Sequence, residues 1–90
     1  MLTSKERAAL RKMANQMQAI IQVGKLGIED NLIRQVDDAL TARELIKVKS
    51  LETAPVSPRE IADELALSTG ADVVQVVGRS IVLWRKNFDK

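Results

Sequence analysis

Two glycines separated by two residues form the segment of this sequence that is best suited to hold a ligand. Gly24, Lys25, Leu26 and Gly27 lie between a short apolar run and an amphipathic pattern, so they are predicted to connect a strand to a helix. Backbone N–H groups at a helix N-terminus lack partners within the helix and attract phosphate oxygens. The glycines leave room for a polyanion's backbone, and Lys25 adds a positive charge. The segment indicates a phosphate-binding loop, although the same spacing is also typical of a plain tight turn.

Basic residues outside the loop supply further candidate contacts to a polyanion. Lys47 and Lys49 alternate with apolar residues, which predicts that both lysines lie on one water-exposed face of a strand. The full set outside the loop is Lys5, Arg11, Lys12, Lys47, Lys49, Arg79 and Arg85. Glu29 and Asp30 oppose this interpretation, because they would compete with a phosphate for the start of the helix that follows the loop. Each basic residue is also compatible with an ordinary solvated surface.

Charge is distributed unevenly along the 90 residues, although 14 basic and 12 acidic side chains give a net charge of only +2. Residues 1–27 carry five basic side chains and one acidic side chain, whereas residues 51–70 carry four acidic side chains and one basic. This separation predicts faces of opposite sign. The basic face suits a polyanion, and the acidic helices suit a basic protein partner, such as a ribosomal protein.

The chain contains no cysteine and no histidine, which excludes disulfides, zinc fingers, thiol nucleophiles and the usual general base. An enzyme would depend on carboxylates, and Glu60, Asp63 and Glu64 are spaced to share Mg²⁺ on one side of a helix. The same pattern is typical of a solvated helix face, so we expect a non-enzyme without metal or other cofactor. No apolar run approaches the roughly 20 residues of a membrane span, and no signal-peptide pattern opens the chain. A cytoplasmic location is expected.

Local patterns predict one α/β (α+β) domain over residues 1–90, with the element order α-β-α-β-α-β-β. Thr3 and Glu6 form a capping box, and Ser57 followed by Pro58 marks the start of the third helix. Helices are predicted over residues 3–17, 28–43 and 57–69, and strands over 19–23, 45–49, 73–77 and 81–84. Two crossover helices require strands of the same direction, and the final hairpin adds an antiparallel strand, giving a mixed four-stranded sheet. Right-handed crossovers place the second and third helices on the same face.

Three segments, VGKLGIEDNLIRQVDDAL, RELIKVKS and ADVVQVVGRSIVLWR, together resemble the bacterial YhbY family and the related CRM domains of organelle RNA-splicing proteins. The resemblance covers nearly the whole chain. It implies a fold similar to the C-terminal domain of bacterial translation initiation factor three. It also implies RNA binding through the GXXG loop and neighbouring basic residues, and association with the precursor of the large ribosomal subunit. The chain departs from the family pattern at Trp84, where tyrosine is frequent, and at Arg43, where histidine is frequent.

These observations lead us to expect a non-catalytic protein that binds large-subunit rRNA or pre-50S particles and assists ribosome assembly, with ribosomal proteins as further partners. Trp84 and Phe88 are the aromatic residues, so contact is expected mainly with the RNA backbone, and Trp84 is expected to belong to the core. If both glycines of the loop are bare to admit RNA, Gly27→Asp should reduce RNA binding more than it reduces stability.

Overall fold

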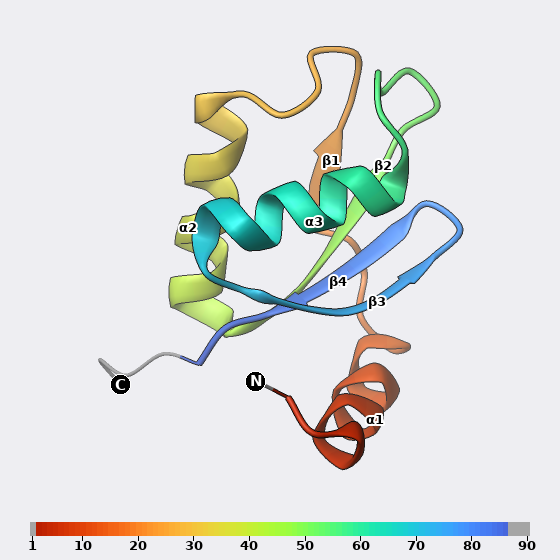
Figure 1. The fold of residues 1–90 in the computed structure, drawn as a ribbon, viewed down its shortest axis with the longest axis vertical. Helices are drawn as coiled ribbons and strands as arrows, with labels where there is room; N and C mark the ends of the chain where they lie inside the picture. The colour runs from red at the N-terminus through yellow and green to blue at the C-terminus, as the bar shows by residue number, and fades with distance from the viewer. Residues whose placement is uncertain (1, 87–90) are drawn as a thin grey trace.

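A four-stranded sheet with the order β1-β2-β4-β3 forms the centre of the molecule (Figure 1). The structure, a computed structural model, describes residues 2–86, so Phe88 lies outside the described residues. The strands are β1 (Ile21–Val23), β2 (Leu45–Ser50), β3 (Asp72–Val77) and β4 (Ser80–Trp84). β1 pairs with β2 in parallel, and β4 lies antiparallel between β2 and β3. The predicted mixed sheet is confirmed, and its last strand lies in the interior of the sheet.

The three helices are α1 (Ser4–Ala14), α2 (Asp30–Arg43) and α3 (Pro58–Thr69). α1 ends three residues before its predicted end at residue 17, and α2 begins two residues after its predicted start at residue 28. The predicted capping box is present: the Thr3 backbone N–H donates to Glu6 Oε1 at 3.2 Å, and this bond lowers the pKa of Glu6. Within residues 2–86, no helix combines the length and the apolar character that a bilayer crossing requires.

α2 and α3 cover the same face of the sheet, as predicted from the handedness of the crossovers. Alternate strand residues and one apolar stripe from each helix form the main core between them. Its buried members are Ile21, Val23, Ile46, Val48, Ile81 and Leu83 from the strands and Leu32, Val36, Leu40, Ile61, Ala62 and Leu65 from the helices. This core fixes where β1 ends and α2 begins, and so it positions the glycine loop.

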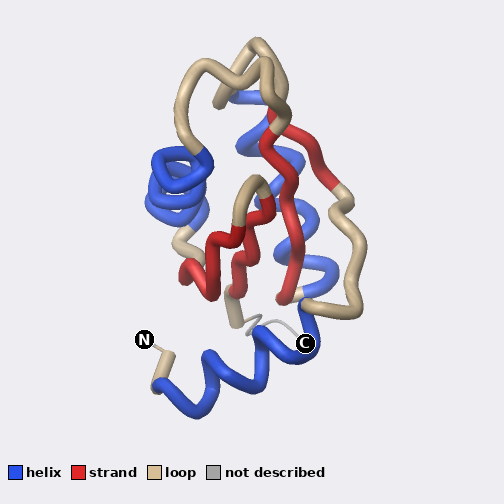
Figure 2. Tube along the Cα trace, turned by 90° about the vertical axis from the view of Figure 1, so that its right-hand side faces the viewer, coloured by secondary structure: helices blue, strands red, loops and turns tan. Residues whose placement is uncertain are grey.

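α1 packs against the other face of the sheet, at the end where β2 begins and β4 stops. A smaller buried cluster joins Leu2, Ala14, Leu45, Val74 and Val82, and Trp84 packs against it half-buried, which agrees with its predicted core role. In Figures 1 and 2, α1 lies at the opposite end of the molecule from the loops that follow β1 and β2.

The prediction that this face of β2 is exposed to water is wrong at Lys47, because α1 covers that part of the strand. Lys47 is half-buried, and its Nζ donates to the carbonyl oxygens of Met17 at 3.3 Å and Ala14 at 3.5 Å. These carbonyls lie at and just beyond the C-terminus of α1, where the helix dipole favours a cation. Lys47 therefore holds the end of α1 against the sheet, whereas Lys49, two residues further on, remains exposed.

Candidate nucleic-acid interface

The glycine loop is a tight turn closed by a hydrogen bond from the Gly27 backbone N–H to the Gly24 carbonyl oxygen at 2.9 Å. Gly27 has a φ of +66°, and a Cβ at this position would lie only 2.9 Å from Cγ of Pro55. A Cβ on Gly24 would meet Leu51 Cδ1 at an ordinary 3.7 Å. The two glycines therefore differ: Gly27 is required by the packing of the loop against Pro55. The expectation that Gly27→Asp would affect binding more than stability is corrected on this ground.

Between the two glycines, Lys25 and Leu26 project outward, and Leu26 is 72% exposed. Glu29 is the N-cap residue of α2, but its side chain makes no capping hydrogen bond. By contrast, the side chains of Thr3 and Ser57 accept hydrogen bonds from the first turns of α1 and α3. The first turn of α2 thus opens beside the glycine loop without a side-chain cap.

A hollow of about 300 Å³ lies between the glycine loop, the edge strand β1 and the first half of α2. Its walls combine apolar, amide and charged side chains. The lining residues are Gln22, Gly24, Lys25, Leu26, Gly27, Glu29, Leu32 and Gln35. The hollow is therefore continuous with the predicted phosphate-binding loop.

Part of the sheet face that carries α1 is left open near the glycine loop. Gln22 and Ser80 are the register partners of Lys49 on β1 and β4, and all three point to this face, because they alternate with core residues. Since β1 and β2 are parallel, their carboxyl ends meet at one edge, and the backbone of Arg79 lies beside Ser50 there. We call Lys25, Lys49 and Arg79 the loop-end cluster.

The loop-end cluster carries little internal compensation of its positive charge. Lys25 and Lys49 are exposed, and within residues 2–86 the ion pairs recorded involve neither of them. Arg79 Nη2 lies 4.0 Å from Glu52 Oε1, but both side chains are largely solvated, and such pairs contribute little. The fold thus places Lys49 and Arg79 at the edge of the sheet from which the glycine loop, with Lys25, departs.

The structure does not bring the basic residues of α1 to this cluster. Lys5, Arg11 and Lys12 are exposed, but α1 occupies the far end of the molecule (Figures 1 and 2). The predicted basic surface is thus divided into the loop-end cluster and a second group on α1, with the open half of the sheet between them.

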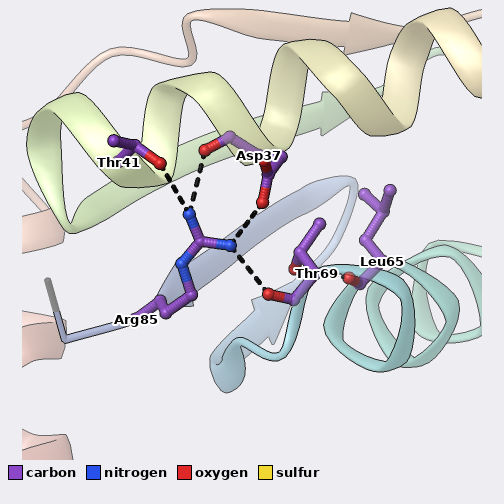
Figure 3. A network of polar contacts seen from close by, with 5 residues as sticks. All are labelled: Asp37, Thr41, Leu65, Thr69 and Arg85. Atoms are coloured by element: carbon purple, nitrogen blue, oxygen red, sulfur yellow. Dashed lines mark hydrogen bonds and ion pairs between the residues drawn. The ribbon is translucent and has the colours of Figure 1, made fainter.

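Arg85 is occupied by intramolecular bonds, which sequence reasoning did not detect (Figure 3). Its guanidinium donates to the carboxylate and the carbonyl oxygen of Asp37, to the Thr69 carbonyl oxygen at 2.7 Å and to Thr41 Oγ1 at 2.9 Å. The side chain is 22% exposed. Arg85 therefore joins the C-terminal half of α2 to the end of α3, and we remove it from the candidate RNA contacts.

Arg85→Lys is expected to lower the free energy of unfolding by about 2 kcal/mol, because an ammonium cannot reproduce the planar fork that reaches several acceptors. RNA affinity, measured at a temperature where the variant is folded, should stay within about twofold of the parent protein. Thermal unfolding and a binding titration on the same sample test this. A variant of normal stability with weakened RNA binding would return Arg85 to the interface.

The carboxylates considered for magnesium belong to an ordinary surface of α3. Asp63 pairs with Arg59, with 3.4 Å between Nη2 and Oδ1, and both side chains are well exposed. Across residues 2–86, no group of three or more acidic side chains is arranged to hold a metal ion. The structure thus adds no support to the magnesium alternative.

Sequence reasoning did not anticipate the hollow or the contact between Pro55 and Gly27. The alternation around Gln22 places its side chain away from the main core, but no local signal links it to Gln35 on the next helix. The two residues line the same hollow because α2 packs along the edge of the sheet.

Nearly the whole chain is similar to known proteins. A family model described as the CRS1/YhbY (CRM) domain matches residues 2–85. The chain is 40% identical over 87 residues to "Probable RNA-binding protein YqeI" of Bacillus subtilis, and the alignment covers 97% of this chain and 91% of the relative. It is 42% identical over 86 residues to "Probable RNA-binding protein MJ0652" of Methanocaldococcus jannaschii, covering 93% of this chain and 63% of the relative.

A solved structure is also similar. The solution structure of the hypothetical protein SAV1595 from Staphylococcus aureus matches with a TM-score of 0.82 and 42% identity, over 97% of this chain and 91% of that chain. The region matched by the family model includes all seven helices and strands and the glycine loop.

Proposed function

Because the chain belongs to the CRS1/YhbY (CRM) domain family, we propose that it is an RNA-binding protein that contacts RNA phosphates with its loop-end cluster. One observation carries the proposal: exposed Lys49 and Arg79 lie at the edge of the sheet from which the glycine loop, with exposed Lys25, departs. Gly24 has no side chain of its own, which lets a sugar-phosphate backbone come near the loop. The names of the similar proteins from Bacillus subtilis and Methanocaldococcus jannaschii support RNA as the ligand.

The basic group on α1 extends the proposed surface. An RNA strand that leaves the loop-end cluster along the open half of the sheet reaches Lys5, Arg11 and Lys12 at the other end of the molecule. With few aromatic residues in the chain, affinity should come mainly from the phosphates, and it should depend strongly on salt.

The salt dependence of binding to single-stranded RNA tests this function. If about five phosphates are contacted, the logarithm of the affinity should fall against the logarithm of the salt concentration with a slope of roughly −3 to −4. Fluorescence anisotropy with a labelled oligonucleotide at several salt concentrations measures the slope. A slope near zero, or no binding at low salt, would contradict the proposal.

The finer role that we propose is assistance in large-subunit assembly in the cytoplasm, through rRNA or pre-50S particles. Its basis is the family resemblance. The test is the sedimentation of the protein from cell extract, with and without nuclease. Co-migration with large-subunit precursors that nuclease abolishes is the expected result. Association that resists nuclease would favour a ribosomal protein partner held by the acidic helices.

A further inference from the structure

The hollow beside the glycine loop differs chemically from the loop-end cluster. Glu29 lines it together with Lys25, so a phosphate inside it would meet a carboxylate as well as an ammonium. No ion pair between Lys25 and Glu29 is recorded within residues 2–86, and the Glu29 side chain does not cap its own helix. The Glu29 carboxylate is exposed and solvated, so a ligand that displaces this water must bring hydrogen-bond donors of its own. The hollow is therefore suited to a neutral group that carries N–H groups.

The volume and the walls of the hollow suit a planar ring. Its volume of about 300 Å³ lies at the lower end of small-molecule sites, enough for one base rather than a folded RNA element. Leu32, only 6% exposed, supplies an apolar floor, and the exposed Leu26 stands at the loop tip on the same hollow. Apolar side chains on either side of a ring exclude water from its faces.

The edges of such a ring would meet three polar side chains. Gln22 and Gln35 each offer an amide that both donates and accepts, and both residues are exposed enough to rotate toward a ligand. The Glu29 carboxylate only accepts. Lys25 lies at the same hollow and belongs to the loop-end cluster, so a nucleotide held by its phosphate there has its base within reach of these groups.

We propose that this hollow binds one unpaired nucleobase of the RNA, and that Glu29 gives it a preference for guanine. Guanine presents two adjacent donors, N1–H and the N2 amino group, which match both oxygens of a carboxylate. Adenine and cytosine place a ring nitrogen acceptor beside their amino group, and uracil flanks its single N–H with two carbonyl oxygens. Guanine alone therefore satisfies both carboxylate oxygens. The inference rests on the proposed RNA binding.

Single-stranded RNA probes that differ in one base test the preference. Oligouridine 12-mers with one central G, A or C are titrated against the full chain by fluorescence anisotropy at fixed salt. The probe with G should bind roughly tenfold more tightly than the probe with A, the size expected of one bidentate base contact. Glu29→Gln should bring this ratio close to one, because the amide places a donor where guanine also has donors.

A matched variant separates base recognition from charge. Glu29→Gln and Glu64→Gln remove the same charge, but Glu64 lies on α3, outside the hollow. Both changes should slightly raise the affinity for the probes without G, because each removes a negative charge. Only Glu29→Gln should weaken binding of the G probe and so lower the ratio between G and A. NMR spectra provide an independent readout: the Leu32 methyl signals should shift with the G probe and much less with the probe of uridines alone.

The outcomes distinguish this inference from the proposed function. If no probe binds at low salt, RNA binding itself is wrong. If all probes bind equally, or if the preference for G survives Glu29→Gln, the guanine site is overturned while RNA binding stands. Because Glu29 is exposed and makes no capping bond, the variant should fold normally, which circular dichroism can verify.

Discussion

Gly27→Ala is expected to lower the free energy of unfolding by about 2–5 kcal/mol, the largest effect expected of an alanine at any of the four glycines. An alanine at a φ of +66° costs about 1–2 kcal/mol. Its Cβ would also lie 2.9 Å from Pro55 Cγ, and such overpacking costs about 1–3 kcal/mol more. For a domain of this size, the melting temperature should fall by roughly 8–40 °C.

Two other glycines separate the two causes. Gly70 ends α3 at a φ of +73° with open space around its Cβ position, so Gly70→Ala should show only the cost of the backbone conformation. Gly24 has neither a positive φ nor a close neighbour, so Gly24→Ala should leave stability within about 0.5 kcal/mol. Pro55→Ala should recover part of the loss in the Gly27→Ala background. Equal stability of the Gly24 and Gly27 variants would refute this account of the loop.

Reversal of two charges in the loop-end cluster is expected to have the largest effect on function. The double variant Lys25→Glu, Lys49→Glu should weaken binding to single-stranded RNA roughly 100-fold at low salt, because each reversal removes a phosphate contact and adds a repulsion. The salt slope should become shallower by about 1.4, the contribution of two phosphates. Anisotropy titrations over a range of salt concentrations measure both quantities.

The control is a pair of arginines on the helical face of the molecule. Arg34→Glu, Arg59→Glu changes the net charge by the same amount, but these residues lie on α2 and α3, away from the open half of the sheet. Its effect on affinity should be several-fold at most, with a nearly unchanged slope. If both double variants lose the same affinity, only the overall charge matters, and the loop-end cluster is not the binding surface.

The elements of the fold were predictable where their signals are local. Ser57 and Pro58 mark the start of α3, Gly70 marks its end, and both agree with the structure. The end of α1 was not predictable, because it involves a distant residue: Lys47 Nζ donates to the carbonyl oxygens of Ala14 and Met17 at and just beyond the end of this helix. The docking side of α1 follows from the same long-range contact.

The candidate site was predictable only in its chemistry. The spacing of the glycines singled out the loop as a candidate contact. Alternation along β2 did the same for Lys49, because it assigns the side chain to a face of the sheet. Alternation does not reveal what covers that face, and so Lys47 appeared equivalent to Lys49. The acceptors that engage Arg85 come from α2 and the end of α3, which meet only in the folded chain.

The interior position of β4 determines when the protein can fold during synthesis. Until residues 80–84 have left the ribosomal exit tunnel, β2 and β3 have no strand to join them, because each pairs with β4 and not with the other. Ile81 and Leu83 also arrive last, although they belong to the main core beneath α2 and α3. The nascent chain therefore completes the sheet face that carries Lys49, whose register partner is Ser80, in one late step rather than by gradual addition from the N-terminus.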